Sequence, residues 1–245
     1  MHNHTDSKMP TIANMPPAQM LYQYMNTNYR ELVRDGKANF DTDSFRDVLQ
    51  QIKSLYDEGL LTADYSMDPE DASLFTLNGL SEPGSALLDL LQPGKQYMQM
   101  PSFDGQPSGF GYSTMLLFGI SSQSAVKEEA WEFIKFMLSE EMQNSPALGG
   151  YPLNKNALEQ KLQESRQKIG QGEVPLPAGQ PSAEALDEHV QTLKDILGNM
   201  ETKMQADLKV VSIAIEEFKA YMSGQKSVEE VSKLIQNRVS TYLNE

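Results

Sequence analysis

Residues 101–153 read PSFDGQPSGFGYSTMLLFGISSQSAVKEEAWEFIKFMLSEEMQNSPALGGYPL, and this stretch carries more structural signals than any other in the chain. Its DG turn dipeptide and the proline that follows predict an opening loop. The apolar, β-prone run from Tyr112 to Ile120 then predicts a buried strand. A helix is expected next, with Ser122 or Ser124 as its N-cap.

The predicted helix has an acidic start and an apolar face. Glu128 and Glu129 suit its first turn, because the helix dipole favours negative charge there. Trp131 shares a face with Ile134 and Met137, so we assign it to the core. The remaining apolar positions of the helix are Ala130, Phe133 and Leu138.

Several of these features together resemble a known family. They are a loop with DGQPSG, a strand ending in GIS, a helix reading AWEFIKFMLSEEMQ, and a GGYPLNK exit. They are similar to the extracellular solute-binding proteins of sugar-importing ABC transporters, of the maltose-binding type found as lipoproteins in Gram-positive bacteria. The tail IEEFKAYMSGQKSVEEVSKLIQNRVSTYLNE is similar to the family's C-terminal helix pair. The resemblance implies a helix-dominated α/β fold of the periplasmic-binding-protein-like type II, mainly its second lobe.

The resemblance also implies a division of the chain. Residues 1–17 would be a disordered leader, and residues 18–113 would belong to the second lobe. Residues 114–153 would cross to the first lobe, and residues 154–245 would return as the C-terminal helices of the second lobe. Family members are longer, so we expect most of the N-terminal lobe to be missing here, with the export signal and lipid anchor upstream of Met1. This chain alone should then bind sugars only in the millimolar range or more weakly.

The implied function is that of an extracytoplasmic receptor, which closes two lobes on a sugar or related solute and presents it to the permease subunits of an ABC importer. Such sites combine aromatic rings stacked on the sugar faces with polar groups around its hydroxyls. The candidates are Tyr112 and Ser113, near the crossing between lobes, and Gly150 and Tyr151, at the exit from the helix. A half-buried packing role is an equally good interpretation of each tyrosine.

A further candidate is the turn at Leu80 and Ser81. A strand, a glycine and a helix start follow one another there, an order that points backbone N–H groups at a ligand. An ordinary strand-to-helix turn is the simpler interpretation. Several relatives carry a Gly-Pro-Trp motif at this turn, so the leucine and serine of this chain offer no aromatic platform. Val211 stands where relatives place another stacking aromatic residue.

Composition limits the classes of partner. The chain has 245 residues, a formal net charge of -14 and no cysteine. The acidic balance argues against nucleic-acid and anionic membrane surfaces, and the lack of cysteine excludes disulfides and thiolate metal sites. No run approaches the roughly 20 apolar residues of a membrane helix, and no signal region starts the chain. We expect no nucleic acid, metal or cofactor.

No catalytic motif is present. The chain lacks a Gly-rich phosphate loop, GxSxG and HExxH. Adjacent glutamates such as Glu216 and Glu217 lie in predicted helices, where neighbours do not face each other, so solvated surface explains them better than acid–base chemistry. We therefore expect a binding protein rather than an enzyme. The alternative is a helix-rich structural or interaction protein without a small-molecule ligand, against which the β-prone stretch between the helices argues.

Apolar periodicity and capping residues predict further helices. Pro17 would start the first, which ends near Asp35-Gly36. Ser227 and Glu230 would form a capping box that starts the last. The other predicted helices run from Asp41 or Asp43 to Gly59, from Ser81 to Pro93, from Asn154 to Lys168, from Ser182 to Gly198, and from Leu208 to Gly224.

Overall fold

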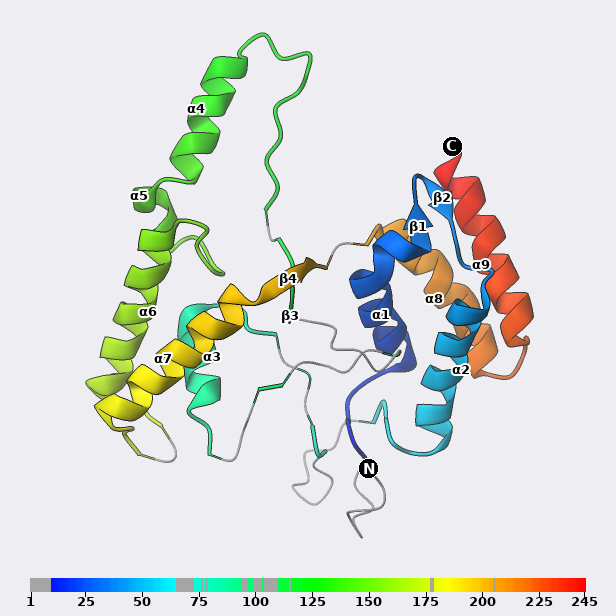
Figure 1. Cartoon of the computed structure of the whole chain (residues 1–245), viewed down its shortest axis with the longest axis horizontal. Coiled ribbons are helices and arrows are strands. Elements are labelled where there is room, and N and C mark those ends of the chain that lie inside the picture. Colours follow the sequence, from blue (N-terminus) through cyan, green and yellow to red (C-terminus); the bar gives the residue numbers. More distant parts are fainter. Residues whose placement is uncertain are drawn as a thin grey trace. The chain divides into compact units, whose positions relative to one another are not determined.

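Helices dominate the computed structural model of this chain (Figure 1). It describes residues 10–64, 73–75, 77, 79–93, 97–98, 103, 110–114, 116–176, 179–204 and 206–245. The described residues are mostly helical, with little sheet, which confirms the helix-dominated class.

The helices of the described residues are α1 (Pro17–Leu32), α2 (Asp43–Asp57), α3 (Pro83–Leu90), α4 (Lys127–Met137), α5 (Glu140–Gln143), α6 (Lys155–Gly170), α7 (Ala183–Gly198), α8 (Leu208–Met222) and α9 (Val228–Leu243). The strands come in pairs: β1 (Val33–Arg34) with β2 (Lys37–Ala38), and β3 (Phe110–Tyr112) with β4 (Met200–Lys203). The sequence patterns did not reveal β4.

The chain forms two compact units. Unit 1 takes in both ends of the chain and comprises Met1–Asn78, Pro101–Pro107 and Thr202–Glu245. Unit 2 is the middle and comprises Gly79–Met100 and Ser108–Glu201. The lobe borders expected at 113/114 and at 153/154 both fall inside unit 2, and the division into lobes stays a prediction.

Unit 1 packs α1, α2, α8 and α9 around one core. Phe45, Val48, Leu49 and Ile52 of α2 are buried along one face, and Gly59 ends that segment in the left-handed region with φ +70°. Phe40 and Phe45 meet edge to face, with ring centroids 5.1 Å apart. Polar side chains of α9 hold the Phe40 backbone: Gln236 Oε1 accepts from its N–H at 2.6 Å, and Ser232 Oγ donates to its carbonyl at 2.6 Å. Helix α9 thereby fixes the chain just before α2.

The described part of the expected leader, residues 10–17, makes defined contacts. Ile12 forms parallel bridges with Leu61 and Phe75, and Met15 is only 2% exposed. The burial of an apolar side chain offsets the entropy of ordering this segment. Residues 1–9, the remaining part of the predicted leader, lie outside the described residues.

A hairpin ends the first helix earlier than predicted. Helix α1 stops at Leu32, not near Asp35-Gly36, because residues 33–38 pair as β1 and β2. Asp35 and Gly36 both have positive φ, 51° and 72°. Two left-handed residues between paired strands form the type I′ turn, whose twist matches that of the strands.

Unit 2 contains a second core between α3, α6 and α7. Asn154 caps α6 and Ser182 caps α7, so both helices begin where the sequence predicts them. On the surface, Lys194 Nζ lies 2.6 Å from a Glu159 carboxylate oxygen and links α7 to α6. The buried residues of this core are Ala86, Leu87, Leu90, Leu162, Ile169, Leu186, Val190 and Leu193.

The buried strand predicted from Tyr112 to Ile120 is wrong in extent and in burial. Strand β3 ends at Tyr112, and residues 116–120 are exposed and have no regular structure. The assignment of Trp131 to the core is also wrong, because its side chain is 48% exposed and α4 has no buried residue. The sequence correctly indicates that these side chains are apolar, but no other described element covers them.

Other local details also differ. Thr42 Oγ1, rather than Asp41 or Asp43, accepts the capping bond of α2 from Phe45 N–H at 3.2 Å. The two aspartates instead form salt bridges with Arg46. Neither Ser122 nor Ser124 is the N-cap of α4, which begins after Val126 without a side-chain cap. Tyr97 and Met98 have no regular structure.

A largely buried carboxylate joins α8 to α9. The Glu217 side chain is 11% exposed and accepts from Lys226 Nζ at 2.7 Å and from Arg238 at 2.6 Å. The hydrogen bond from Lys226, opposed by burial and aided by Arg238, lowers the pKa of Glu217 below its ordinary value. Arg238 also pairs with Glu216, whose side chain is 67% exposed.

This network predicts a loss of stability in acid. A carboxylate whose pKa is lower in the folded state contributes stability above its unfolded pKa, and that contribution disappears as pH falls through the folded pKa. Glu217→Gln should cost about 1–2 kcal/mol of unfolding free energy at pH 7, and the difference from the unsubstituted chain should shrink below about pH 4. Urea titrations across pH test this. Glu216→Gln, which breaks the exposed pair with the same Arg238, is the control and should cost little at any pH. Equal effects of the two substitutions would contradict the assignment.

The predicted capping box is confirmed at the start of α9. Ser227 Oγ accepts from Glu230 N–H at 3.2 Å, and a Glu230 carboxylate oxygen accepts from Ser227 N–H at 2.8 Å. Ser227→Ala should therefore lower the unfolding free energy by about 1 kcal/mol. Lys233→Ala, at an exposed position of the same helix, should change it by less than about 0.5 kcal/mol. Denaturant unfolding of both variants is the measurement, and equal losses would show that the cap contributes nothing.

Candidate functional site

Tyr151 lies at a turn between α5 and α6 and packs against the core of unit 2. Gly150 before it has φ +84°, a left-handed conformation that glycine adopts without strain. The side chain of Tyr151 is half-buried, and its Oη is buried with no hydrogen-bond partner among the described residues. Burial, followed by the nearby Tyr97 and Glu82, raises the pKa of the Tyr151 hydroxyl. A neutral, unpaired hydroxyl thus lies at a position predicted to bind ligand.

Tyr97 belongs beside Tyr151, although the sequence patterns did not mark it as a site residue. It packs against the same core, and its Oη donates to Asp89 Oδ2 at 3.3 Å. Burial and the Asp89 carboxylate raise the pKa of Tyr97 to about 12. The sequence signal for Tyr97 is weak, because it is only an aromatic residue that follows Pro93 at the end of a short predicted helix.

The turn before α3 contributes one of its two predicted residues to this group. Leu80 packs against the same core as Tyr151. Ser81 is exposed, and its Oγ lies 3.1 Å from Ser85 Oγ, within hydrogen-bond distance. Leu80 therefore contributes to apolar packing, and Ser81 contacts the first turn of α3.

The structure does not bring Tyr112 and Ser113 into this group. Both are exposed, at the end of β3 and just after it, and neither packs against the core that holds Tyr151. The predicted set is therefore divided: Leu80, Gly150 and Tyr151 lie around the unit 2 core, while Tyr112 and Ser113 begin an exposed segment.

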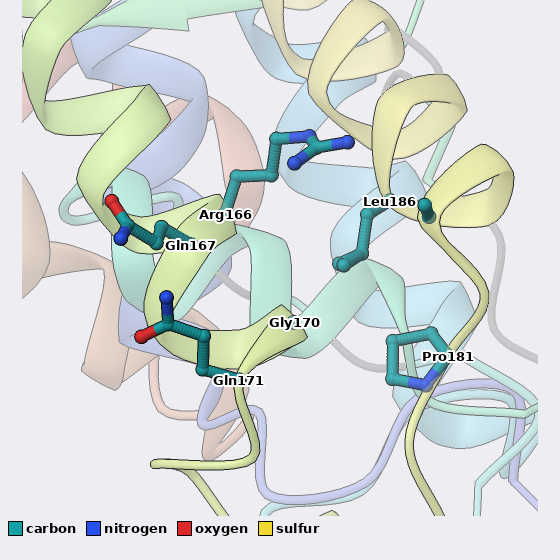
Figure 2. A pocket seen from close by; sticks show the side chains of 7 residues that line it. Arg166, Gln167, Gly170, Gln171, Pro181 and Leu186 are labelled. Carbon is teal, nitrogen blue, oxygen red and sulfur yellow. The ribbon is translucent and has the colours of Figure 1, made fainter.

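Two surface hollows are shallow and contain none of the predicted site residues. Figure 2 shows the one between the end of α6 and the start of α7, with a volume of about 250 Å³. Its arginine, Arg166, is already bonded to Asp187 at 2.5 Å. The other, of about 280 Å³, lies on the polar face of α2. Both are smaller than the roughly 300–1,000 Å³ of ordinary small-molecule sites. The first is lined by Arg166, Gln167, Gly170, Gln171, Pro181, Ala183 and Leu186.

Metal-ligating side chains do not gather in the described parts of the chain. Those parts hold no cluster of three or more His, Cys, Asp or Glu able to bind a metal ion. His189 Nδ1 lies 2.5 Å from the Ala185 carbonyl oxygen, one turn earlier on α7. None of the described helices is long and apolar enough to cross a membrane.

An exposed apolar segment follows Ser113. Along residues 116–138, leucine, valine, isoleucine and aromatic side chains are exposed both in the loop and on α4. Monomeric proteins rarely expose apolar patches larger than a few hundred Å². This segment is thus a second feature with a functional signature, distinct from the surroundings of Tyr151.

Removal of the Tyr151 hydroxyl should stabilise the chain. A buried polar group without a partner costs about 1–3 kcal/mol, so Tyr151→Phe should raise the unfolding free energy by about 1 kcal/mol. Tyr242→Phe is the control, because Tyr242 Oη donates to Asp207 Oδ2 at 3.0 Å and its removal should destabilise. Urea unfolding gives both values, and a loss of stability in Tyr151→Phe would show that the hydroxyl is paired.

A scan against protein-family models gives no match, and a search of curated proteins gives none either.

Proposed function

We propose that this chain is a solute-binding component of an extracytoplasmic ABC-importer receptor with a periplasmic-binding-protein-like type II fold. The motifs of residues 101–153 and the C-terminal helix pair support this family. The organisation into two units is compatible with it, since unit 1 is built from both ends of the chain and unit 2 from the middle. A receptor whose chain crosses between lobes has such a discontinuous arrangement.

The observation that carries the proposal is the environment of Tyr151. Its half-buried side chain ends in an unpaired hydroxyl, beside the hydrogen-bonded pair of Tyr97 and Asp89. Because the Tyr151 hydroxyl is buried, a sugar reaches it only when the turn at Gly150 and Tyr151 opens. A sugar hydroxyl, which both donates and accepts, then satisfies it, and the aromatic ring stacks on the sugar face. We therefore assign Tyr151 as the principal contact to a sugar or related polyol.

Titration with sugars by heteronuclear NMR tests the proposal, because the method detects the weak binding expected here. A dissociation constant on the order of 1 mM corresponds to about -4 kcal/mol. Glucose, maltose and xylose are added separately to the ¹⁵N-labelled chain. We expect at least one of them to shift the amide signals of Gly150 and Tyr151. No shift with any of them would contradict sugar binding by this chain.

A matched pair of variants locates the contact. Tyr151→Phe should lower the affinity for the sugar that binds by about threefold to tenfold, which is the effect of one lost hydrogen bond. Tyr22→Phe, on α1 in unit 1, should leave the affinity unchanged. Equal affinity in both variants would place the site elsewhere.

The second candidate is an interaction protein without a small-molecule ligand. The exposed apolar side chains of residues 116–138 favour it, since such surfaces are typical of protein contacts. The two candidates differ in the NMR experiment, because only the receptor gives saturable, local shifts with a sugar.

A further inference from the structure

The apolar arm, defined as the described residues 113–114 and 116–138, has no buried side chain. It consists of the loop after β3 and the helix α4, drawn in green in Figure 1. Nine of its large apolar side chains are among the exposed ones. They are Leu116, Leu117, Phe118, Ile120, Val126, Trp131, Phe133, Phe136 and Leu138.

An aromatic contact joins the two parts of the apolar arm. The rings of Phe118, in the loop, and Phe133, on α4, meet edge to face with centroids 6.1 Å apart. Each ring remains about half exposed despite this contact. The loop and helix are thus connected by their own apolar side chains, and the outer surfaces of both rings stay in water.

The exposed area is large enough for a stable interface. At about 100 Å² for each of the nine side chains, roughly half of what an aromatic residue can bury, the apolar arm exposes on the order of 900 Å² over its loop and α4. That total is comparable with the roughly 800 Å² that each partner contributes to a standard protein–protein interface.

The charge pattern favours an apolar occupant over a charged one. Residues 105–126 contain no Asp, Glu, Lys, Arg or His, in a chain with 54 Asp, Glu, Lys and Arg residues and a net charge of -14. On α4, Lys135 is paired with Glu132 at 2.6 Å. The loop therefore offers no counter-charge to a basic or acidic partner, and two copies of the loop meet without like charges. The charges of the apolar arm outside that pair are Lys127, Glu128 and Glu129, at the start of α4.

We propose that the apolar arm is the interface with a second copy of this chain. A two-fold symmetric dimer places the same patch on both sides, so each arm supplies the apolar area that the other needs. The β-prone run 116–120, which has no strand partner in the described chain, is covered in the same contact. This inference does not depend on sugar binding.

Sedimentation equilibrium of the full chain measures the association. We expect a species of twice the 27.4 kDa chain mass in the micromolar range. Higher salt should tighten the dimer, because it screens the repulsion between two copies of charge -14. Hydrogen exchange of residues 116–138 should slow as protein concentration rises. A monomer mass at every concentration and salt level overturns the proposal.

Exposed leucines provide a matched pair of variants. Leu117→Ser, in the apolar arm at 67% exposed, should weaken the dimer at least tenfold, whereas Leu208→Ser, in unit 1 at 71% exposed, should not change it. Both replace side chains that are already in water, and unchanged circular dichroism confirms that each variant folds. A dimer that withstands Leu117→Ser and Phe136→Ser together overturns the proposal. So does a monomer that floats with uncharged phosphatidylcholine vesicles, since the occupant is then lipid.

Discussion

A helix of a few turns is stable in water only when another element covers its apolar stripe, and this requirement organises both units. In unit 1, α8 and α9 cover each other and are completed by α1 and α2. In unit 2, α6 and α7 close over the short α3. Helix α4 also carries apolar residues, but none of its residues is buried. The functional proposals concern two places that lack such a partner. The Tyr151 hydroxyl has no hydrogen-bond partner among the described residues, and no other described element covers the apolar arm.

Local signals predicted much of this fold because they act within one turn of helix. Asn154, Ser182 and Ser227 cap helices where the sequence places them, and Gly59 and Gly224 adopt the left-handed conformation that ends one. Each depends on hydrogen bonds between residues a few positions apart, so no tertiary information is needed.

The predictions that failed depended on what lies opposite a side chain. Trp131 has helical spacing typical of a core residue, yet periodicity shows only that a face is apolar, and not that another layer covers it. The run after Tyr112 has strand propensity, but a strand requires a pairing partner. At the candidate site, Gly150 and Tyr151 could be chosen from the sequence, whereas Tyr97 could not. Its relation to Tyr151 arises only because both pack on the core of unit 2.

The hydrogen bonds between α9 and the Phe40 backbone affect the order in which parts of the chain can fold during synthesis. Gln236 and Ser232 lie almost two hundred residues after Phe40, so these contacts form only when the C-terminal helices leave the ribosome. At about 5–20 residues per second, the early helices α1 and α2 wait on the order of ten seconds for their covering layer. The middle of the chain is complete sooner and can collapse first. Nascent chains of this protein therefore present uncovered apolar helices to chaperones from both their oldest and their newest parts.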